Sequence, residues 1–308
     1  MKQTIVVKLR PSTDQHAALL ATMKRFNAAC DYIARVAFER RLVNKVALQK
    51  LVYYQVRERF GLSSQLTVRA IAKVAEAYRP DKTVQPAFRP HGAVCYDQRI
   101  MSWKGVEEVS LLTLAGRKLI PVRFGTYQAA RLDRRQGQAD LVLKDGVFYL
   151  YVTIDVSEPP AGEPDDYLGL DLGIVNLAVD SDGTTYSGEA VERHRRIDAH
   201  RRRNLQRKGT KAAKRKLRQL GRRRSRYQRN ENHRISKAVV QNAKGTRRGL
   251  ALEDLKGVRD RTERTVRRRQ RARHGNWSFH QLRSFVEYKA RAAGVRVAVV
   301  NPRNTSRT

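Results

Sequence analysis

The chain has 308 residues, enough for two or three domains, and its 41% of hydrophobic residues is sufficient for packed cores. Lysine and arginine number 64 against 29 aspartate and glutamate, so the formal net charge is +35. This composition excludes a disordered tail protein and indicates a polyanionic partner, with nucleic acid as the first candidate. No apolar run approaches the roughly 20 residues that span a bilayer, and the N-terminus has no signal-peptide core. Cys30 and Cys95 form neither a zinc motif nor a disulfide framework, so we expect a cytoplasmic protein without a membrane partner.

The first half of the chain begins with a predicted strand at residues 4–10. Ser12 or Thr13 can cap a helix that runs to about residue 41, because apolar residues recur there at helical spacing. A second helix is expected over residues 46–60 and a third from Ser63 or Ser64, with a proline just past its end. We interpret residues 13–79 as one helical insertion.

Short strands and turns follow from residue 83. Candidate strands are residues 93–96, 107–112, 117–124 and 139–143, and Asp145-Gly146 predicts a hairpin between residues 140–144 and 147–155. Several strands with one helical insertion after the first predict a small β-barrel built from residues 1–12 and 80–156. Residues 157–164, SEPPAGEP, are rich in proline and predict a linker to a second domain at residues 165–308.

The second half opens with YLGLDLGIVNLAVDSDG, residues 167–183. Its leucines alternate with Gly169, Asp171 and Gly173, so Asp171 faces away from the apolar side of a strand, between two residues that leave open space. Taken alone, the stretch also fits a hairpin with an exposed aspartate that has no role. A later stretch, GLALEDLKG at residues 249–257, places Glu253 in the same way beside Ala251.

Two carboxylates on neighbouring strands repel one another in a dry site. They become favourable when they share hard divalent cations, and two such ions about 4 Å apart can clamp the attacking and leaving oxygens of a phosphodiester. Asp171 and Glu253 are therefore candidate metal ligands and catalytic residues. Asp254 turns to the opposite face by strand alternation. Asp180, on the neighbouring hairpin strand, could approach the pair although its spacing does not require it, and it is the first place to look for a further ligand if the chain cleaves DNA.

Between these two stretches, residues 189–243 are dominated by arginine and lysine and predict a helix pair with a turn near Gly209. No acidic residue lies between Asp198 and Glu231, so a phosphate backbone is the natural counter-charge. The candidate nucleic-acid contacts are Arg201, Arg202, Arg203, Lys208, Lys211, Lys214, Arg215, Arg222, Arg223 and Arg224.

A second basic block, residues 259–273, predicts a mobile loop over the site. Asn276 or Ser278 then caps a helix that ends at Gly294, and residues 295–300 predict a last buried strand. The order β-β-β-α-β-α-β is that of an RNase H-like fold short of its final helix, and it makes the strands of Asp171 and Glu253 neighbours. The expected fold class is therefore mixed: a small β-barrel with a helical insertion, then an RNase H-like α/β domain.

Three stretches resemble a known family. GLDLGIVNLAVDSDG and ALEDLKG resemble the first and second RuvC motifs of the TnpB/OrfB proteins of insertion sequences, and WSFHQLRSFVEYKARAAGVRVAVVNPRNTS resembles the segment that follows. The resemblance is close in the second half of the chain. In the first half only the order of the elements is similar, and there the family carries a wedge barrel with an inserted recognition domain. It implies an RNA-guided DNA endonuclease, related to type V CRISPR effectors, with an Asp, a Glu and a final Asp holding magnesium. Asp171 and Glu253 match the first two acidic residues.

In the family, a cysteine-rich zinc ribbon and the final Asp follow the Thr-Ser that corresponds to Thr305 and Ser306. Neither is found in the 308 residues, which resemble a C-terminally truncated TnpB. We therefore expect magnesium, a guide RNA and target DNA as partners, no zinc ligands, and a nuclease that is inactive or impaired, so whether the chain is an enzyme is left open. The alternative is a non-cleaving nucleic-acid-binding protein or regulator derived from a transposase gene. A basic structural RNA-binding protein is disfavoured, because phosphate-binding surfaces avoid unpaired acids.

Overall fold

The computed structural model describes residues 1–173, 175–254 and 279–300. The chain divides into two compact units, Met1–Val156 and Ser157–Thr308, and the division falls where the linker was expected to begin. The second basic block and the predicted helix caps Asn276 and Ser278 lie outside the described residues. Within the described part of the chain, no helix has the length and apolar character needed to cross a membrane.

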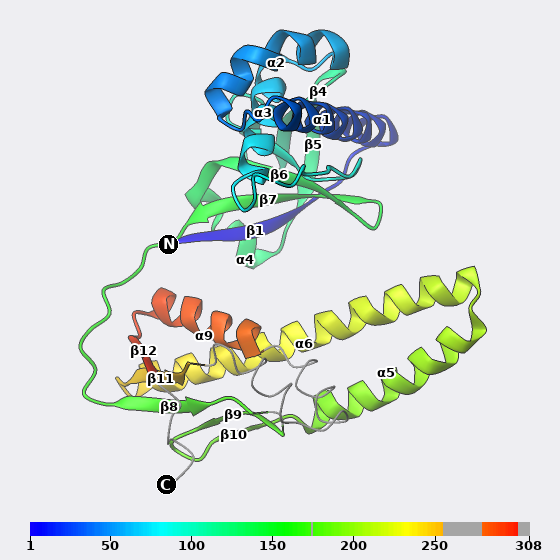
Figure 1. Cartoon of the computed structure of the whole chain (residues 1–308). Helices are drawn as coiled ribbons and strands as arrows, with labels where there is room; N and C mark the ends of the chain where they lie inside the picture. Colours follow the sequence, from blue (N-terminus) through cyan, green and yellow to red (C-terminus); the bar gives the residue numbers. More distant parts are fainter. Residues whose placement is uncertain (174, 255–278, 301–308) are drawn as a thin grey trace. The chain divides into compact units, whose positions relative to one another are not determined.

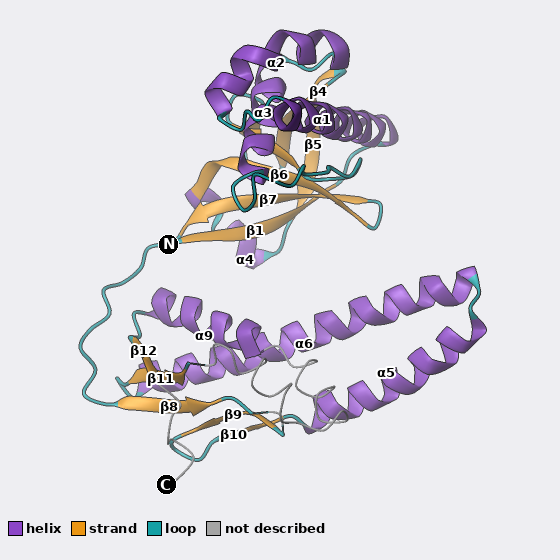
Figure 2. Cartoon of the chain, in the orientation of Figure 1, coloured by secondary structure: helices purple, strands orange, loops and turns teal. Residues whose placement is uncertain are grey.

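The first unit is built on an antiparallel, nearly closed barrel-like sheet with the strand order β2-β6-β7-β1-β5-β4-β3 (Figure 2). Its strands are β1 (Lys2–Leu9), β2 (Val94–Asp97), β3 (Met101–Lys104), β4 (Glu108–Thr113), β5 (Gly116–Arg123), β6 (Arg135–Lys144) and β7 (Val147–Asp155). The hairpin between β6 and β7 is confirmed: Asp145 and Gly146 both have positive φ, 54° and 78°, as a tight hairpin turn requires.

Three helices follow β1 and pack together on the barrel: α1 (Thr13–Glu39), α2 (Lys45–Phe60) and α3 (Ser64–Ala77). Ser12 caps α1, accepting from the backbone N–H of Gln15 while the Gln15 side chain accepts from the backbone N–H of Ser12. Gly61 ends α2 in the left-handed region. The sequence did not predict β3, the four-residue helix α4 (Thr126–Ala129) or the 3-10 turn Leu132–Arg134.

The second unit contains a five-stranded sheet with the order β10-β9-β8-β11-β12. The strands are β8 (Tyr167–Asp171), β9 (Asn176–Asp180), β10 (Thr185–Ser187), β11 (Gly249–Glu253) and β12 (Val297–Val300). Strands β8, β11 and β12 run parallel, while β9 and β10 are antiparallel to their neighbours. This is the RNase H-like arrangement that the element order predicted, with β8 at its centre.

Two helices cover one face of this sheet. The long helix α6 (Lys211–Gly245) and α9 (Phe279–Ala293) lie side by side and bury the leucines of β8 and β11 (Figure 1). Helix α5 (Glu189–Lys208) pairs with the first part of α6, and this hairpin extends beyond the sheet. The prediction of a buried last strand at residues 295–300 is wrong for the end of β12. This strand is the last in the order of the described strands, and its Val299 and Val300 are 51% and 39% exposed.

Candidate metal site and nucleic-acid interface

Asp171 and Glu253 end two neighbouring parallel strands. Leu170 pairs with Leu252 across β8 and β11, so the next residues along the two strands lie beside one another on the face that α6 and α9 do not cover. Adjacent strands are about 4.8 Å apart, which places the two carboxylates within reach of a shared cation. Asp171 is exposed and Glu253 half-buried, and Gly169 adds no side chain to this face.

The donor chemistry of this pair suits magnesium, which prefers carboxylate oxygens and retains several waters when few protein ligands are present. Among residues 1–173, 175–254 and 279–300, no group of three or more His, Cys, Asp or Glu side chains is placed to hold a metal ion. Asp171 and Glu253 are therefore the residues that could hold such an ion as a pair.

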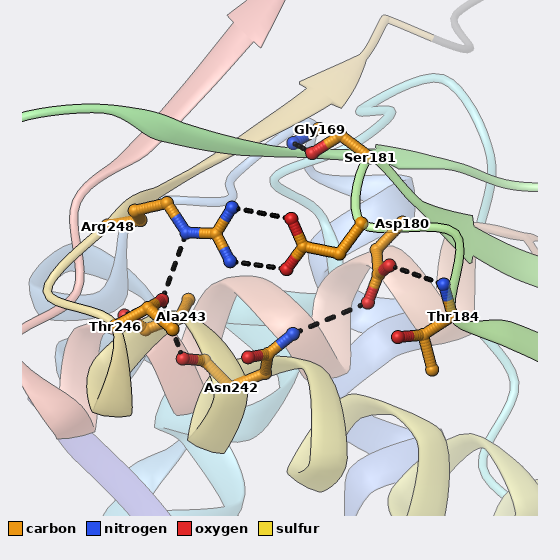
Figure 3. A network of polar contacts seen from close by, with 9 residues as sticks. Gly169, Asp180, Ser181, Thr184, Asn242, Ala243, Thr246 and Arg248 are labelled. Atoms are coloured by element: carbon orange, nitrogen blue, oxygen red, sulfur yellow. Dashed lines mark hydrogen bonds and ion pairs between the residues drawn. The ribbon is translucent and has the colours of Figure 1, made fainter.

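Asp180 does not join the pair. It pairs with Leu170 across β8 and β9, so it shares the helix-covered face, whereas Asp171 points to the other side. Its carboxylate is 4% exposed; Oδ1 accepts from the Thr184 backbone N–H at 2.8 Å, and Oδ2 lies 3.5 Å from Asn242 Nδ2 on α6 (Figure 3). The expectation that Asp180 is the first candidate for a further ligand is therefore wrong, and its role is to tie the turn after β9 to α6.

A second contact lies near the turn after β9. The guanidinium of Arg248 makes a bidentate ion pair with Asp182, with Nη1 2.8 Å from Oδ1, and its Nε donates to the Thr246 hydroxyl (Figure 3). The hydrogen bond from Arg248 lowers the pKa of the Asp182 carboxyl. The connection from α6 into β11 is thus fixed against the hairpin of β9 and β10.

Arg283 on α9 fixes the other end of β11. Its Nη1 donates to the Asp254 carboxylate at 3.2 Å and to the Glu253 carbonyl at 3.4 Å, and its Nε donates to Glu287 at 2.8 Å. The backbone N–H of Asp254 also donates to the Val300 carbonyl at 2.9 Å. Asp254 lies on the face of the sheet that the helices cover, as alternation predicted. Its carboxylate binds Arg283 next to Glu253. The sequence could not reveal this contact, because 29 residues separate its two partners.

The basic helix pair forms as predicted. Gly209 ends α5 with φ of 64°, and the Thr210 hydroxyl caps α6 by accepting from the Ala213 N–H. Of the ten candidate nucleic-acid contacts, Arg224 is half-buried and the other nine are exposed. Ion pairs in α5 involve Glu192, which holds Arg195 and Arg196 near the start of the helix. The hairpin therefore presents a long cationic surface on two helices.

The sequence did not predict a hollow of about 280 Å³ between α5 and α6. Its lining includes His194 and Tyr227, whose rings contact one another with centroids 4.4 Å apart, together with Arg195, Arg223 and Arg224. The hollow lies along the cationic surface and adds two rings to it. Helical periodicity alone gives no signal for such a feature, because it depends on how the two helices pair.

Comparison with known proteins finds similar families, a similar curated protein and a similar solved structure. Residues 149–258 match the OrfB_IS605 family, described as a probable transposase, and residues 279–308 match the Cas12f1-like TNB domain. The TnpB-like protein MJ0751 of Methanocaldococcus jannaschii is 35% identical over 75 residues, which cover 24% of this chain and 27% of that protein. A cryo-EM structure of a Cas12f1–sgRNA–target DNA complex aligns with 100% of this chain and 87% of its own, at 13% identity and a TM-score of 0.37.

The aligned stretch thus spans about a quarter of the length of that curated relative. The two family matches lie mainly over the unit that holds Asp171, Glu253 and the basic helix pair, and they define a transposase-associated protein. By these matches, the second unit of the chain is similar to TnpB family proteins.

Proposed function

We propose that this protein is the scaffold of an RNA-guided, magnesium-dependent DNA endonuclease. The observation that carries the proposal is the register of β8 and β11, which sets Asp171 and Glu253 side by side on the face of an RNase H-like sheet opposite α6 and α9. Magnesium held there would neutralise the charge that develops on a phosphodiester and lower the pKa of an attacking water.

The chain's own residues have distinct tasks in this proposal. Asp171 and Glu253 hold the ion, and Arg283 keeps the end of β11 in place through Asp254. The basic surface of α5 and α6 binds the backbone of a guide RNA or of its heteroduplex with DNA. In such a system, base pairing reads the sequence while the protein reads shape and backbone charge.

The test supplies the full chain with Mg²⁺, a candidate guide RNA and matched DNA, and compares it with Asp171→Asn and Glu253→Gln. Asp165→Asn is the matched control, because it removes the same charge from an exposed residue before β8. We expect all four proteins to bind nucleic acid equally, and any cleavage to be lost in the Asp171 and Glu253 variants alone. Cleavage that survives both substitutions would refute the metal site. Binding without cleavage in all four would assign the chain a binding role only.

A further inference from the structure

Helix α2, in the first unit, carries an aromatic side chain that does not pack in the core. Tyr54 is 77% exposed, while the same helix buries Leu48, Val52 and Val56 against α1 and α3. Tyrosine is a weaker helix former than alanine, so an exposed tyrosine in a helix contributes little to stability. The position therefore calls for an explanation outside folding.

The surroundings of Tyr54 are cationic. The ring of Tyr53 meets it edge-on, with centroids 5.2 Å apart and an interplanar angle of 84°, and Arg57 lies 5.8 Å from the centroid of Tyr53. Lys50 precedes Tyr54 by one helical turn, on the same side. Tyr53 thus contacts the Tyr54 ring. Lys50 lies one turn before Tyr54, and Arg57 and the acidic Glu58 lie one turn after it.

The positive charge continues along the chain between Glu39 and Glu58. From Arg40 to Arg57 the sequence has no acidic residue and five basic ones, all of them exposed: Arg40, Arg41, Lys45, Lys50 and Arg57. At the end of α2, Arg59 lies over the rings of Tyr32 and Phe60, at 4.9 and 5.8 Å. Figure 1 shows α2 on the outside of the helical layer, where a ligand can reach it.

We propose that this face of α2 binds unpaired nucleotides of single-stranded nucleic acid. Tyr54 stacks on a base, and Lys50 and Arg57 contact the flanking phosphates. Exposed aromatic rings between cations are the means by which proteins hold single strands, since every base has a face to stack. A base inside a duplex is already stacked on its neighbours, so an intact duplex gains only the charge contacts. The site lies in the other compact unit from the α5–α6 surface and does not depend on the nuclease proposal.

The test measures the affinity of the full chain for a labelled, unstructured oligonucleotide of about eight nucleotides and for a blunt duplex of the same sequence. The variants are Tyr54→Ala and Tyr54→Phe, each made with Arg201, Arg202 and Arg203 replaced by alanine to reduce binding by α5. The matched control is Tyr127→Ala, because Tyr127 is 56% exposed but Arg131 already covers its ring at 3.9 Å.

We expect Tyr54→Ala to weaken single-strand binding by about 5- to 100-fold, which is the usual range for losing one stacked base. Tyr54→Phe keeps the ring, so its single-strand affinity should stay within about twofold of the parent protein's, and the same holds for Tyr127→Ala. The duplex affinities of all the variants should also stay within about twofold. The proposal is overturned if Tyr54→Ala leaves single-strand affinity unchanged, if Tyr54→Phe loses as much as Tyr54→Ala, or if duplex affinity falls equally. Circular dichroism of Tyr54→Ala should show an unchanged fold.

Discussion

Replacing Arg283 with methionine should destabilise the second unit, because the guanidinium holds α9 to the end of β11. The substitution keeps the apolar stem and removes three hydrogen bonds, to Asp254, to the Glu253 carbonyl and to Glu287. Buried hydrogen bonds to charged groups contribute about 1.5–3 kcal/mol, whereas exposed ion pairs contribute about 0.2–1 kcal/mol. Arg283 is 18% exposed and its carboxylate partners 35% and 39%, so the contacts lie between these limits. We therefore expect a loss of about 1–2 kcal/mol.

The assay is urea unfolding of the full chain, followed by a probe in the second unit, for Arg283→Met, Asp254→Asn and the double variant. A double-mutant cycle isolates the pair, and we expect a coupling of about 0.5–1 kcal/mol. Arg296→Met is the control, because its ion pair with Glu163 is solvent-exposed and its loss should change stability little. A coupling below about 0.3 kcal/mol, or an equal loss in the control, would refute the reasoning.

Three further predictions concern charge, pH and domain structure. Replacing Arg201, Arg202 and Arg203 with alanine should reduce the log–log salt slope of duplex DNA binding by up to about 3, which equilibrium titrations at several salt concentrations measure; an unchanged slope would show that α5 makes no phosphate contact. Burial raises the pKa of the Cys30 thiol to about 12, so the unfolded chain releases this proton first and stability should fall by up to about 1.4 kcal/mol per unit above pH 9. Cys30→Ala should unfold with a shallower pH dependence between pH 9 and 11, and an identical dependence would contradict the assignment. Limited proteolysis should cut within residues 157–164 before it cuts the helices and strands of either unit.

Local patterns predicted the elements with strong periodicity or distinctive turn residues. Asp145-Gly146 indicated its hairpin because few residues other than glycine, asparagine and aspartate accept positive φ. Gly209 indicated the turn between α5 and α6 for the same reason. Strand β3 was missed because its four residues, MSWK, show neither clear alternation nor a run of β-branched side chains.

Of the site, the sequence predicted only the features that follow from the alternation and order of the strands. Alternation assigned Asp171 and Asp254 to opposite faces, and the element order made the strands of Asp171 and Glu253 neighbours. The face of Asp180 depended on the register between β8 and β9, which the bend between these strands left undefined in the sequence. Arg283 could not be assigned at all, because its contacts join α9 to β11 and require the packed structure.

The most direct test of the central claim is a titration of the full chain with Mn²⁺, a magnesium substitute whose free ion is counted by electron paramagnetic resonance. The account predicts that Asp171→Asn and Glu253→Gln each weaken binding at least about tenfold, as removal of a charged ligand should. Asp180→Asn and Asp165→Asn should bind as the unmodified chain does, because one carboxylate faces α6 and the other precedes β8. Undiminished binding by Asp171→Asn, or a loss in Asp180→Asn as large as in Glu253→Gln, would contradict the assignment of Asp171 and Glu253 as the metal ligands.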